Sequence, residues 1–311
     1  VLAAAVCGTD VHIQEWDPFA ARRMTPPSII GHEFAGEVME LGAGVSGFKK
    51  GDIVAGETHI VCHSCELCRN GEAHVCYNTK TFGLSRNGCF AQYAVIPAEN
   101  AFICDPAVPV EVSSLMEPLG VAVHAALEFP LAGKDVAVAG CGPIGVMAVA
   151  VAKKTGAARV IALEPNKDRA ALAVKMGADD VVNPIAEDPV EKVRALTGGR
   201  GADVVLEFSG NIQAIKAAIS YLKPQGKMAA VGLPARPVEF DFSEFVYRGL
   251  TLRGIAGRRM FQTWEQMAGL LRAGLDVSPV VTHVLPLAEF EEGLRLMKAG
   301  EGSKIILKPW A

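Results

Sequence analysis

The sequence predicts an α/β protein whose central part is a doubly wound parallel sheet, because short β-type apolar runs alternate there with helical segments. Two further features support this fold class. A glycine-rich turn, Gly140-Cys-Gly-Pro-Ile-Gly145, directly follows one of the apolar runs. Four closely spaced cysteines lie between residues 62 and 76. Together these features predict a dinucleotide-binding sheet and a separate metal-binding loop.

The four cysteines have the spacing C-x2-C-x2-C-x7-C. A tetrahedral zinc ion takes four thiolates, and cysteines two residues apart can reach one ion from a single tight loop. The alternative is a disulfide framework, which is typical of small secreted domains rather than of a chain of 311 residues. The spacing therefore predicts a structural zinc site. Its ligands are Cys62, Cys65, Cys68 and Cys76.

Composition limits the remaining classes of function. Half of the residues are hydrophobic and 21% are charged, which is typical of a globular chain, and 311 residues are expected to form two domains. A net charge of −4 gives no support for a nucleic-acid partner. The uncharged run 136–152 is interrupted by glycines and Pro143, so we interpret it as a buried strand and helix, not a membrane span. Eight cysteines, four of them clustered for metal, fit a reducing compartment.

The glycine turn has the context that a dinucleotide site requires. A strand is predicted over residues 135–140, a helix over 146–155 and a second strand over 159–163. The alternation continues along the chain. Further strands are predicted at 180–183, 203–208 and 227–232, with helices at 189–197 and 213–222.

Each glycine of the turn has a physical role. Gly140 permits the turn, Gly142 lets a pyrophosphate approach the backbone, and Gly145 lets helix and strand pack closely. The phosphates are expected at the amino terminus of the helix, where free N–H groups favour an anion. Glu164, at the end of the second strand, is placed to bind the adenosine ribose hydroxyls and to repel a 2′-phosphate. NAD is therefore favoured over NADP.

Three short segments lie outside both motifs: Cys7-Gly-Thr9-Asp-Val-His12, Gly31-His32-Glu33 and Glu117-Pro118. Taken singly, each has an ordinary structural interpretation, such as a buried thiol, a core histidine or a solvated acid. Together they supply a thiol, an imidazole and carboxylates. A catalytic zinc that keeps one coordination position open uses these ligand types.

These motifs, in this order, resemble the zinc-dependent medium-chain dehydrogenases, and the similarity covers essentially all 311 residues. The sequences that carry it are CGTDVHI, GHEFAGEV, the four-cysteine lobe, EPLG and GCGPIG. Within the family, other segments resemble the branch that oxidises L-threonine. They are CGTDVHIQEWD, GETHIVC, NTKTFG, GRRMFQTW and SPVVTH.

The resemblance implies a GroES-like, mostly β catalytic domain over residues 1–119, from which the amino-terminal strands of the family are missing. It implies a Rossmann NAD-binding domain over 120–257 and a return to the catalytic domain over 258–311. Each subunit would carry NAD and two zinc ions, one catalytic and one structural. Relatives also imply a homotetramer in the cytoplasm.

Site residues follow from the resemblance position by position. The catalytic zinc ligands would be Cys7, His32 and Glu33. Thr9 and His12 would form a proton relay, and Glu117 would be an exchangeable ligand or part of the relay. The positions that match contacts to NAD are Gly140, Gly142, Ile144, Gly145, Glu164, Arg169, Val231, Gly232, Leu233, Ile255 and Ala256.

The implied reaction is the NAD-dependent oxidation of the L-threonine hydroxyl to 2-amino-3-oxobutanoate, a step of threonine catabolism. Arg258 or Arg259 is expected to recognise the substrate carboxylate or the nicotinamide side of the cleft, the alternative being two surface charges. Two other functions stay open. The chain could be a polyol or butanediol dehydrogenase of the same family, or an inactive truncated chain that binds NAD and zinc.

Overall fold

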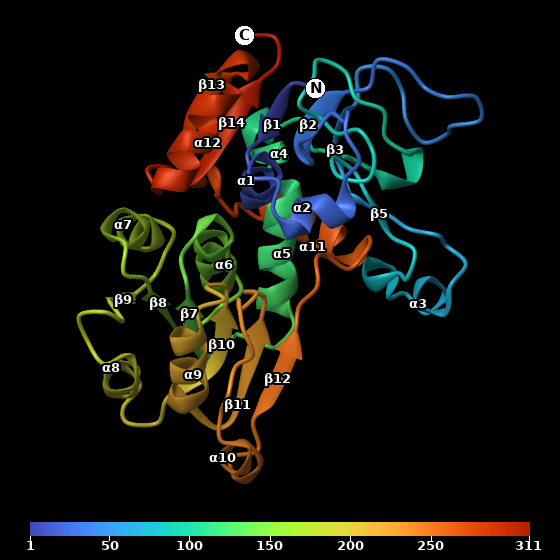
Figure 1. The fold of residues 1–311 in the computed structure, drawn as a ribbon. Coiled ribbons are helices and arrows are strands. Elements are labelled where there is room, and N and C mark those ends of the chain that lie inside the picture. Colours follow the sequence, from blue (N-terminus) through green and yellow to red (C-terminus); the bar gives the residue numbers. More distant parts are fainter. The chain divides into compact units, whose positions relative to one another are not determined.

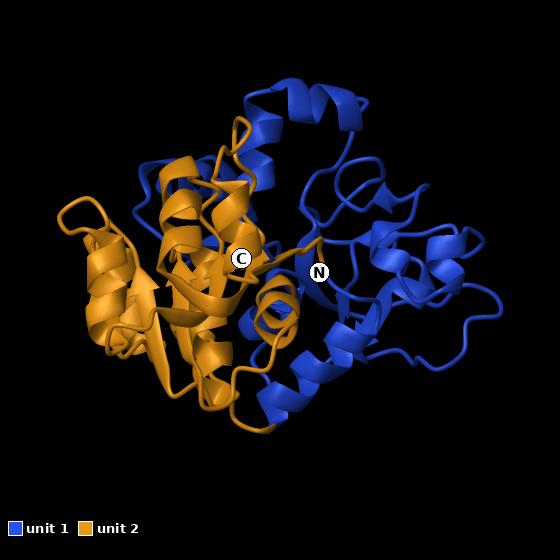
Figure 2. Cartoon of the chain, turned by 90° about the horizontal axis from the view of Figure 1, so that it is seen from below, with its two compact units in different colours: residues 1–120, 258–272, 281–311 blue, residues 121–257, 273–280 orange.

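The computed structural model describes all residues from 1 to 311, and the chain divides into two compact units. Unit 1 contains Val1–Gly120, Arg258–Arg272 and Val281–Ala311, whereas unit 2 contains Val121–Gly257 and Ala273–Val280 (Figure 2). The chain returns to unit 1 after residue 257, as predicted, but residues 273–280 belong to unit 2 and interrupt this return.

Contacts within unit 2 explain this correction. The ammonium of Lys154 donates a hydrogen bond of 2.6 Å to the carbonyl of Ala273. The short helix η3 (Ser278–Val280) packs against two helices of unit 2, and Val277 and Val280 are fully buried. These partners lie about a hundred residues away in the sequence, so local patterns give no sign of them.

Unit 2 contains a six-stranded parallel sheet with the order β12-β11-β10-β7-β8-β9 (Figure 1). Its strands are β7 (Asp135–Ala139), β8 (Arg159–Leu163), β9 (Asp180–Val182), β10 (Ala202–Glu207), β11 (Leu222–Ala230) and β12 (Thr251–Gly254). Its helices are α6 (Pro143–Lys154), α7 (Lys167–Lys175), α8 (Pro189–Leu196), α9 (Ile212–Tyr221) and α10 (Phe242–Tyr247). The strand order reverses between β7 and β10, which confirms the doubly wound arrangement.

The elements predicted in unit 2 are confirmed, but helix α10 and strand β12 were not predicted, and two further differences occur. Helix α7 was not predicted, although Asn166 caps it by accepting hydrogen bonds from the N–H groups of Asp168 and Arg169. Strand β11 begins at Leu222, directly after α9, and not at residue 227. Pro224 and exposed residues disturb the first half of β11, so this half lacks the apolar pattern of a buried strand.

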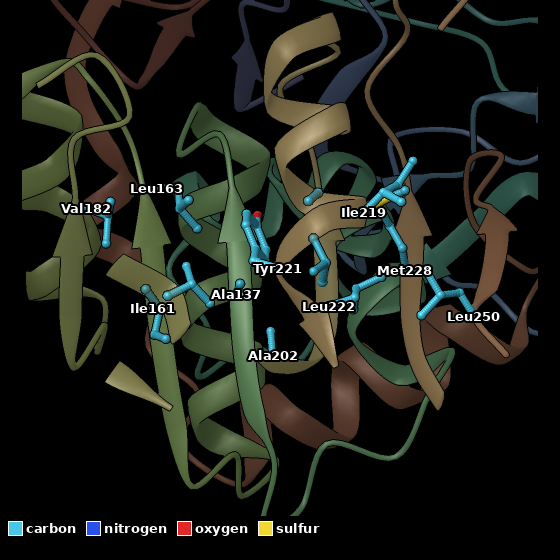
Figure 3. Packing of buried hydrophobic residues seen from close by; sticks show 13 residues of the cluster. Ala137, Ile161, Leu163, Val182, Ala202, Ile219, Tyr221, Leu222, Met228 and Leu250 are labelled. Carbon is cyan, nitrogen blue, oxygen red and sulfur yellow. The ribbon is translucent and has the colours of Figure 1, made fainter. Parts of the chain in front are cut away.

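The core of unit 2 lies along this sheet. Buried side chains from β7, β8 and β10 meet residues of α9 and β11, and Figure 3 shows Ala137, Ile161, Tyr221 and Met228 among them. Strands of a parallel sheet that helices cover on both faces are apolar throughout, which explains runs such as that of β7. Each fully buried Leu, Ile or Val contributes roughly 1.5–3 kcal/mol.

Unit 1 contains a mixed six-stranded sheet with the order β13-β14-β1-β2-β3-β6. The strands are β1 (Ala3–Ala5), β2 (Glu33–Glu37), β3 (Ile53–Gly56), β6 (Ala101–Ile103), β13 (Val281–Pro286) and β14 (Lys304–Lys308), and a small separate sheet pairs β4 (His59–Ile60) with β5 (Lys80–Thr81). Strand β1 lies between β2 and β14, with Ala4 opposite both Phe34 and Leu307. Unit 1 is therefore built on a β-sheet, as the fold class predicts.

Short helices complete unit 1, and the division between the units falls within α5. The helices are α1 (Gly8–Gln14), α2 (Pro18–Arg23), α3 (Glu66–Arg69), α4 (Val110–Ser113), α5 (Met116–Leu127), α11 (Gln262–Arg272) and α12 (Phe290–Ala299), together with η1 (Ala73–Val75), η2 (Ala98–Asn100) and η4 (Leu287–Glu289). None of the helices combines the length and the apolar composition that crossing a lipid bilayer requires.

Candidate functional site

The four clustered cysteines of unit 1 meet in one lobe. Helix α3 begins after Cys65, and η1 ends at Cys76. The Sγ atoms of Cys65 and Cys68 are 3.5 Å apart, as are those of Cys62 and Cys76, and all four lie within 4.8 Å of one another. These separations exceed the S–S bond of about 2.05 Å. They fit four thiolates around a zinc ion at about 2.3 Å from each sulfur.

One thiol of this lobe ionises easily. Hydrogen bonds from the side chain and the backbone of Ser64 are the main reason that the pKa of Cys62 is lowered to about 5. A thiol must lose its proton before it binds a metal ion. Cys62 therefore offers a thiolate at neutral pH, and the donor set fits a closed zinc site.

A second group of metal-ligand residues also meets in unit 1. Cys7 directly precedes α1, and His32 and Glu33 lie at the start of β2. Strand β1, which ends two residues before Cys7, pairs with β2 and so brings Cys7 close to His32 and Glu33. Their ligand atoms lie within 4.8 Å of one another, and His32 and Glu33 are buried. One thiolate, one imidazole and one carboxylate are the ligands of an open zinc site, so these three residues fit a catalytic metal.

Two buried polar atoms, one in this group and one on Asp10, have no hydrogen-bond partner. Oδ1 of Asp10 and Nδ1 of His32 accept or donate no hydrogen bond, although the other oxygen of Asp10 accepts the N–H of Cys7 at 2.8 Å. Burial raises the pKa of Asp10, and the neighbouring His32 opposes that shift. Buried polar atoms without partners are rare in folded proteins, which supports an ion-binding function here. Sequence analysis did not identify Asp10.

A buried lysine is another residue that sequence analysis missed. Nζ of Lys304, on β14, lies 2.6 and 2.5 Å from the two carboxylate oxygens of Glu33. It also donates a hydrogen bond of 3.4 Å to the carbonyl of Val6. Burial alone would lower the pKa of Lys304, but Glu33, with smaller contributions from Cys7 and Glu117, outweighs it and raises that pKa. Lys304 therefore holds a positive charge beside the predicted metal ligands.

The two residues predicted to relay a proton lie on α1, three positions apart and thus on one face of the helix. Oγ1 of Thr9 is 3.8 Å from Sγ of Cys7. The side chain of His12 is 54% exposed, and its Nδ1 lies 2.7 Å from Oδ2 of Asp17. One end of this pair is therefore near the metal ligands, and the other end is in solvent.

Glu117 lies in the first turn of α5, and its carboxylate is bound by Arg258. Oε1 of Glu117 accepts hydrogen bonds from Arg258 at 2.5 Å and from the hydroxyl of Thr58 at 3.3 Å. Arg258 also donates two hydrogen bonds, of 2.9 and 2.5 Å, to the two oxygens of Glu57. Its side chain is only 2% exposed.

The prediction that Arg258 recognises a substrate carboxylate is therefore wrong. The donors of its guanidinium are directed at Glu57, Thr58 and Glu117 of the same chain, and burial removes it from solvent. Arg259 is half-buried, and for it the prediction stays.

The predicted nucleotide residues of unit 2 follow the carboxyl ends of its strands. Gly140 follows β7, and Glu164 follows β8. Both line a cavity of about 540 Å³, together with Gly142 and Arg169. No side chain caps α6, so its first N–H groups are available to an anion. A Cβ atom on Gly145 would collide with the carbonyl of Gly140, which explains the need for glycine.

Glu164 is fixed in place by backbone groups. Its two oxygens accept hydrogen bonds from the N–H groups of Cys141 at 2.8 Å and Asn166 at 2.9 Å. Nε of Arg169 is buried without a partner. The other predicted nucleotide residues do not line this cavity but follow β11 and β12 or start α6. They are Ile144, Gly145, Val231, Gly232, Leu233, Ile255 and Ala256.

Two family profiles match the chain. The profile described as alcohol dehydrogenase GroES-like domain matches residues 1–106, and the profile described as zinc-binding dehydrogenase matches residues 143–273. The first match contains both metal-ligand groups, and the second begins within the glycine turn, at Pro143.

Individual relatives cover nearly the whole chain. The L-threonine 3-dehydrogenase of Caldanaerobacter subterraneus is 47% identical over 99% of this chain and 90% of its own length. That of Pyrococcus horikoshii is 45% identical over 98% of this chain and 89% of its own length. Among solved structures, 2R,3R-butanediol dehydrogenase from Bacillus subtilis is 29% identical and has a TM-score of 0.90, covering 99% of this chain and 91% of its own.

Proposed function

The chain belongs to the zinc-binding dehydrogenase family, and on that premise we propose that it oxidises the hydroxyl of L-threonine to the ketone of 2-amino-3-oxobutanoate. The observation that carries the proposal is the meeting of Cys7, His32 and Glu33 around one point in a chain nearly half identical to threonine dehydrogenases.

In this reaction two bound groups supply the chemistry. A zinc ion held by Cys7, His32 and Glu33 would act as a Lewis acid that lowers the pKa of the substrate hydroxyl, and NAD would accept a hydride from the β-carbon. The protein binds and orients these groups. It also removes the hydroxyl proton, for which we assign Thr9 and His12, because Thr9 lies beside Cys7 and His12, one turn further along α1, is exposed to solvent.

The nucleotide is assigned to the cavity beside Gly140, Gly142, Glu164 and Arg169. The start of α6 would bind the pyrophosphate, and Glu164 would accept hydrogen bonds from the adenosine ribose. Further contacts are assigned to the first turn of α6 and to the residues that follow β11 and β12. They are Ile144, Gly145, Val231, Gly232, Leu233, Ile255 and Ala256.

Replacement of Glu164 by alanine is expected to raise the Kd of NAD and to narrow the preference for NAD over NADP. The change removes the ribose contact and the repulsion of a 2′-phosphate. Fluorescence titration with both nucleotides measures the two constants. Glu187→Ala is the matched control, because that acid is exposed and outside the cavity. A wild-type preference for NADP would contradict the assignment.

Metal analysis is expected to find two zinc ions per chain. The four-cysteine site offers no open coordination position, whereas the site of Cys7, His32 and Glu33 offers one. A chelator should therefore remove the ion at Cys7, His32 and Glu33 faster than the ion at the four cysteines. Cys7→Ser should leave one slowly exchanging ion, and Cys65→Ser should leave the other. A wild-type protein with a single zinc ion would contradict the two-site assignment.

The second candidate function is oxidation of a polyol or of 2,3-butanediol, which the likeness to butanediol dehydrogenase favours. An inactive NAD- and zinc-binding chain is the third. NAD reduction by the purified chain with threonine, sorbitol and 2,3-butanediol decides among them. Threonine should give the highest kcat/KM, and no turnover with any substrate would favour the inactive chain. A homotetramer in the cytoplasm is also part of the proposal, supported by the resemblance alone.

A further inference from the structure

Arg258 forms a buried hydrogen-bond network with Glu57 and Glu117, in which the Glu57 carboxylate is held at both oxygens. Both oxygens of Glu57 accept hydrogen bonds, from Arg258, from the indole N–H of Trp264 at 2.8 Å and from the N–H of His59 at 2.8 Å. Burial alone would raise the pKa of Glu57, but Arg258 and His59 together outweigh it and lower that pKa well below its usual range. Glu57 therefore stays charged and holds the guanidinium through a two-point contact.

The other end of the network, at Glu117, is held differently. Only Oε1 of Glu117 is bound, by Arg258 and Thr58, and Oε2 accepts no hydrogen bond from the protein. The side chain of Glu117 is 13% exposed. The charge of Glu117 is one of the smaller causes that raise the pKa of Glu33, and the charge of His32 helps to lower the pKa of Glu117, so these groups are electrostatic neighbours. One oxygen of Glu117 is thus immobilised, and the other stays available beside the predicted metal ligands.

Space for Arg258 is provided by α5 itself. Gly120 lies one turn after Glu117, and a Cβ atom there would be 2.5 Å from Cδ of Arg258. The aliphatic part of the arginine therefore passes over the helix only because position 120 has no side chain. A lysine could follow the same path, but one ammonium cannot bind Glu57 at two points and reach Glu117 as well.

We propose that Arg258 is a positioning residue: anchored on Glu57, it fixes Glu117 by one oxygen and presents the other to the group formed by Cys7, His32 and Glu33. The inference rests on the proposed function in so far as that group holds a metal ion. It assigns a role to Arg258 that differs from substrate binding. It also limits Glu117 to a contact through a single oxygen.

The test uses the protein with zinc in the four-cysteine site and Co²⁺ in the site of Cys7, His32 and Glu33. Arg258→Lys is expected to change the visible Co²⁺ spectrum and to weaken Co²⁺ binding by about 10–100-fold, the usual effect of losing a residue that orients a ligand. In a Glu117→Gln background the same substitution should add little, because the carboxylate that Arg258 positions is already absent.

Arg248→Lys is the matched control. Arg248 lies in unit 2 and donates hydrogen bonds to the backbone carbonyls of Ile219 and Leu222. Its substitution should lower thermal stability without changing the Co²⁺ spectrum. Should Arg258→Lys fail to fold, Thr58→Val removes the other donor to the same oxygen of Glu117 and should shift the spectrum in the same direction, by less.

Equal effects of Arg258→Lys with and without the Glu117 carboxylate would overturn the inference, and so would an unchanged Co²⁺ spectrum in both Arg258→Lys and Thr58→Val. The spectrum does not depend on turnover. A wild-type chain that fails to oxidise threonine would therefore refute the proposed function alone, and the Co²⁺ comparison would still decide the role of Arg258.

Discussion

Replacing Lys304 by methionine is expected to lower the free energy of unfolding of the metal-free protein by about 3–5 kcal/mol. Lys304 is buried and binds both oxygens of Glu33. Methionine keeps most of the side-chain volume but leaves the Glu33 carboxylate buried without a counter-ion. Urea unfolding of the two proteins, after treatment with a chelator, measures the difference.

Lys308→Met is the matched control on the same strand. Lys308 pairs with Glu111, but their side chains are 24% and 32% exposed, so the loss should be below about 1 kcal/mol. Zinc gives a second comparison, because a cation beside Glu33 would replace the missing ammonium. The cost of Lys304→Met should therefore shrink when zinc is bound. An equal cost with and without zinc would place Glu33 outside the metal site.

Replacement of His12 by alanine is expected to lower kcat at neutral pH by about 10²–10⁴-fold, the usual contribution of a group that transfers a proton. The imidazole is half-exposed and paired with Asp17, so it can pass a proton to solvent. Zinc content and the Kd of NAD should stay unchanged, because His12 belongs to neither binding site. Steady-state kinetics, metal analysis and nucleotide titration together check the expectation.

His63→Ala is the control for this substitution. His63 is exposed to a similar degree, 59% against 54%, and also lies near an acidic partner, Glu99. Its loss should leave kcat within about twofold of the wild type, as for other exposed residues outside the site. Unchanged turnover in His12→Ala, or loss of zinc from it, would remove His12 from the relay.

The parts of the fold that sequence analysis predicted depend on neighbours in the sequence. The glycine turn combines a strand, a tight bend and a helix within about twenty residues, and each glycine has a local steric reason. The same holds for Cys62, Cys65 and Cys68, whose spacing alone lets them reach one ion. Local physics therefore predicted the nucleotide sheet and the four-cysteine lobe.

The buried ion pairs that sequence analysis missed join residues across long separations. Lys304 meets Glu33 across 271 residues, and Arg258 meets Glu57 across 201 residues. Lysine and arginine are usually exposed, so each sequence position on its own predicts a surface charge. Lys304 and Lys308 look equivalent at the two ends of β14, and only tertiary packing makes the first buried and the second half-exposed.

The position of β1 between β2 and β14 has a consequence for the order in which the protein assembles. While the chain is being synthesised, β1 can pair with β2 early, but its other edge has no partner until residues 304–308 have left the ribosome. The six strands of the nucleotide sheet, by contrast, are complete once residue 254 is available. An open strand edge is a surface on which unfinished chains can associate. The nucleotide sheet can therefore form first, and the sheet that carries Glu33 and Lys304 closes only after residues 304–308 have been synthesised.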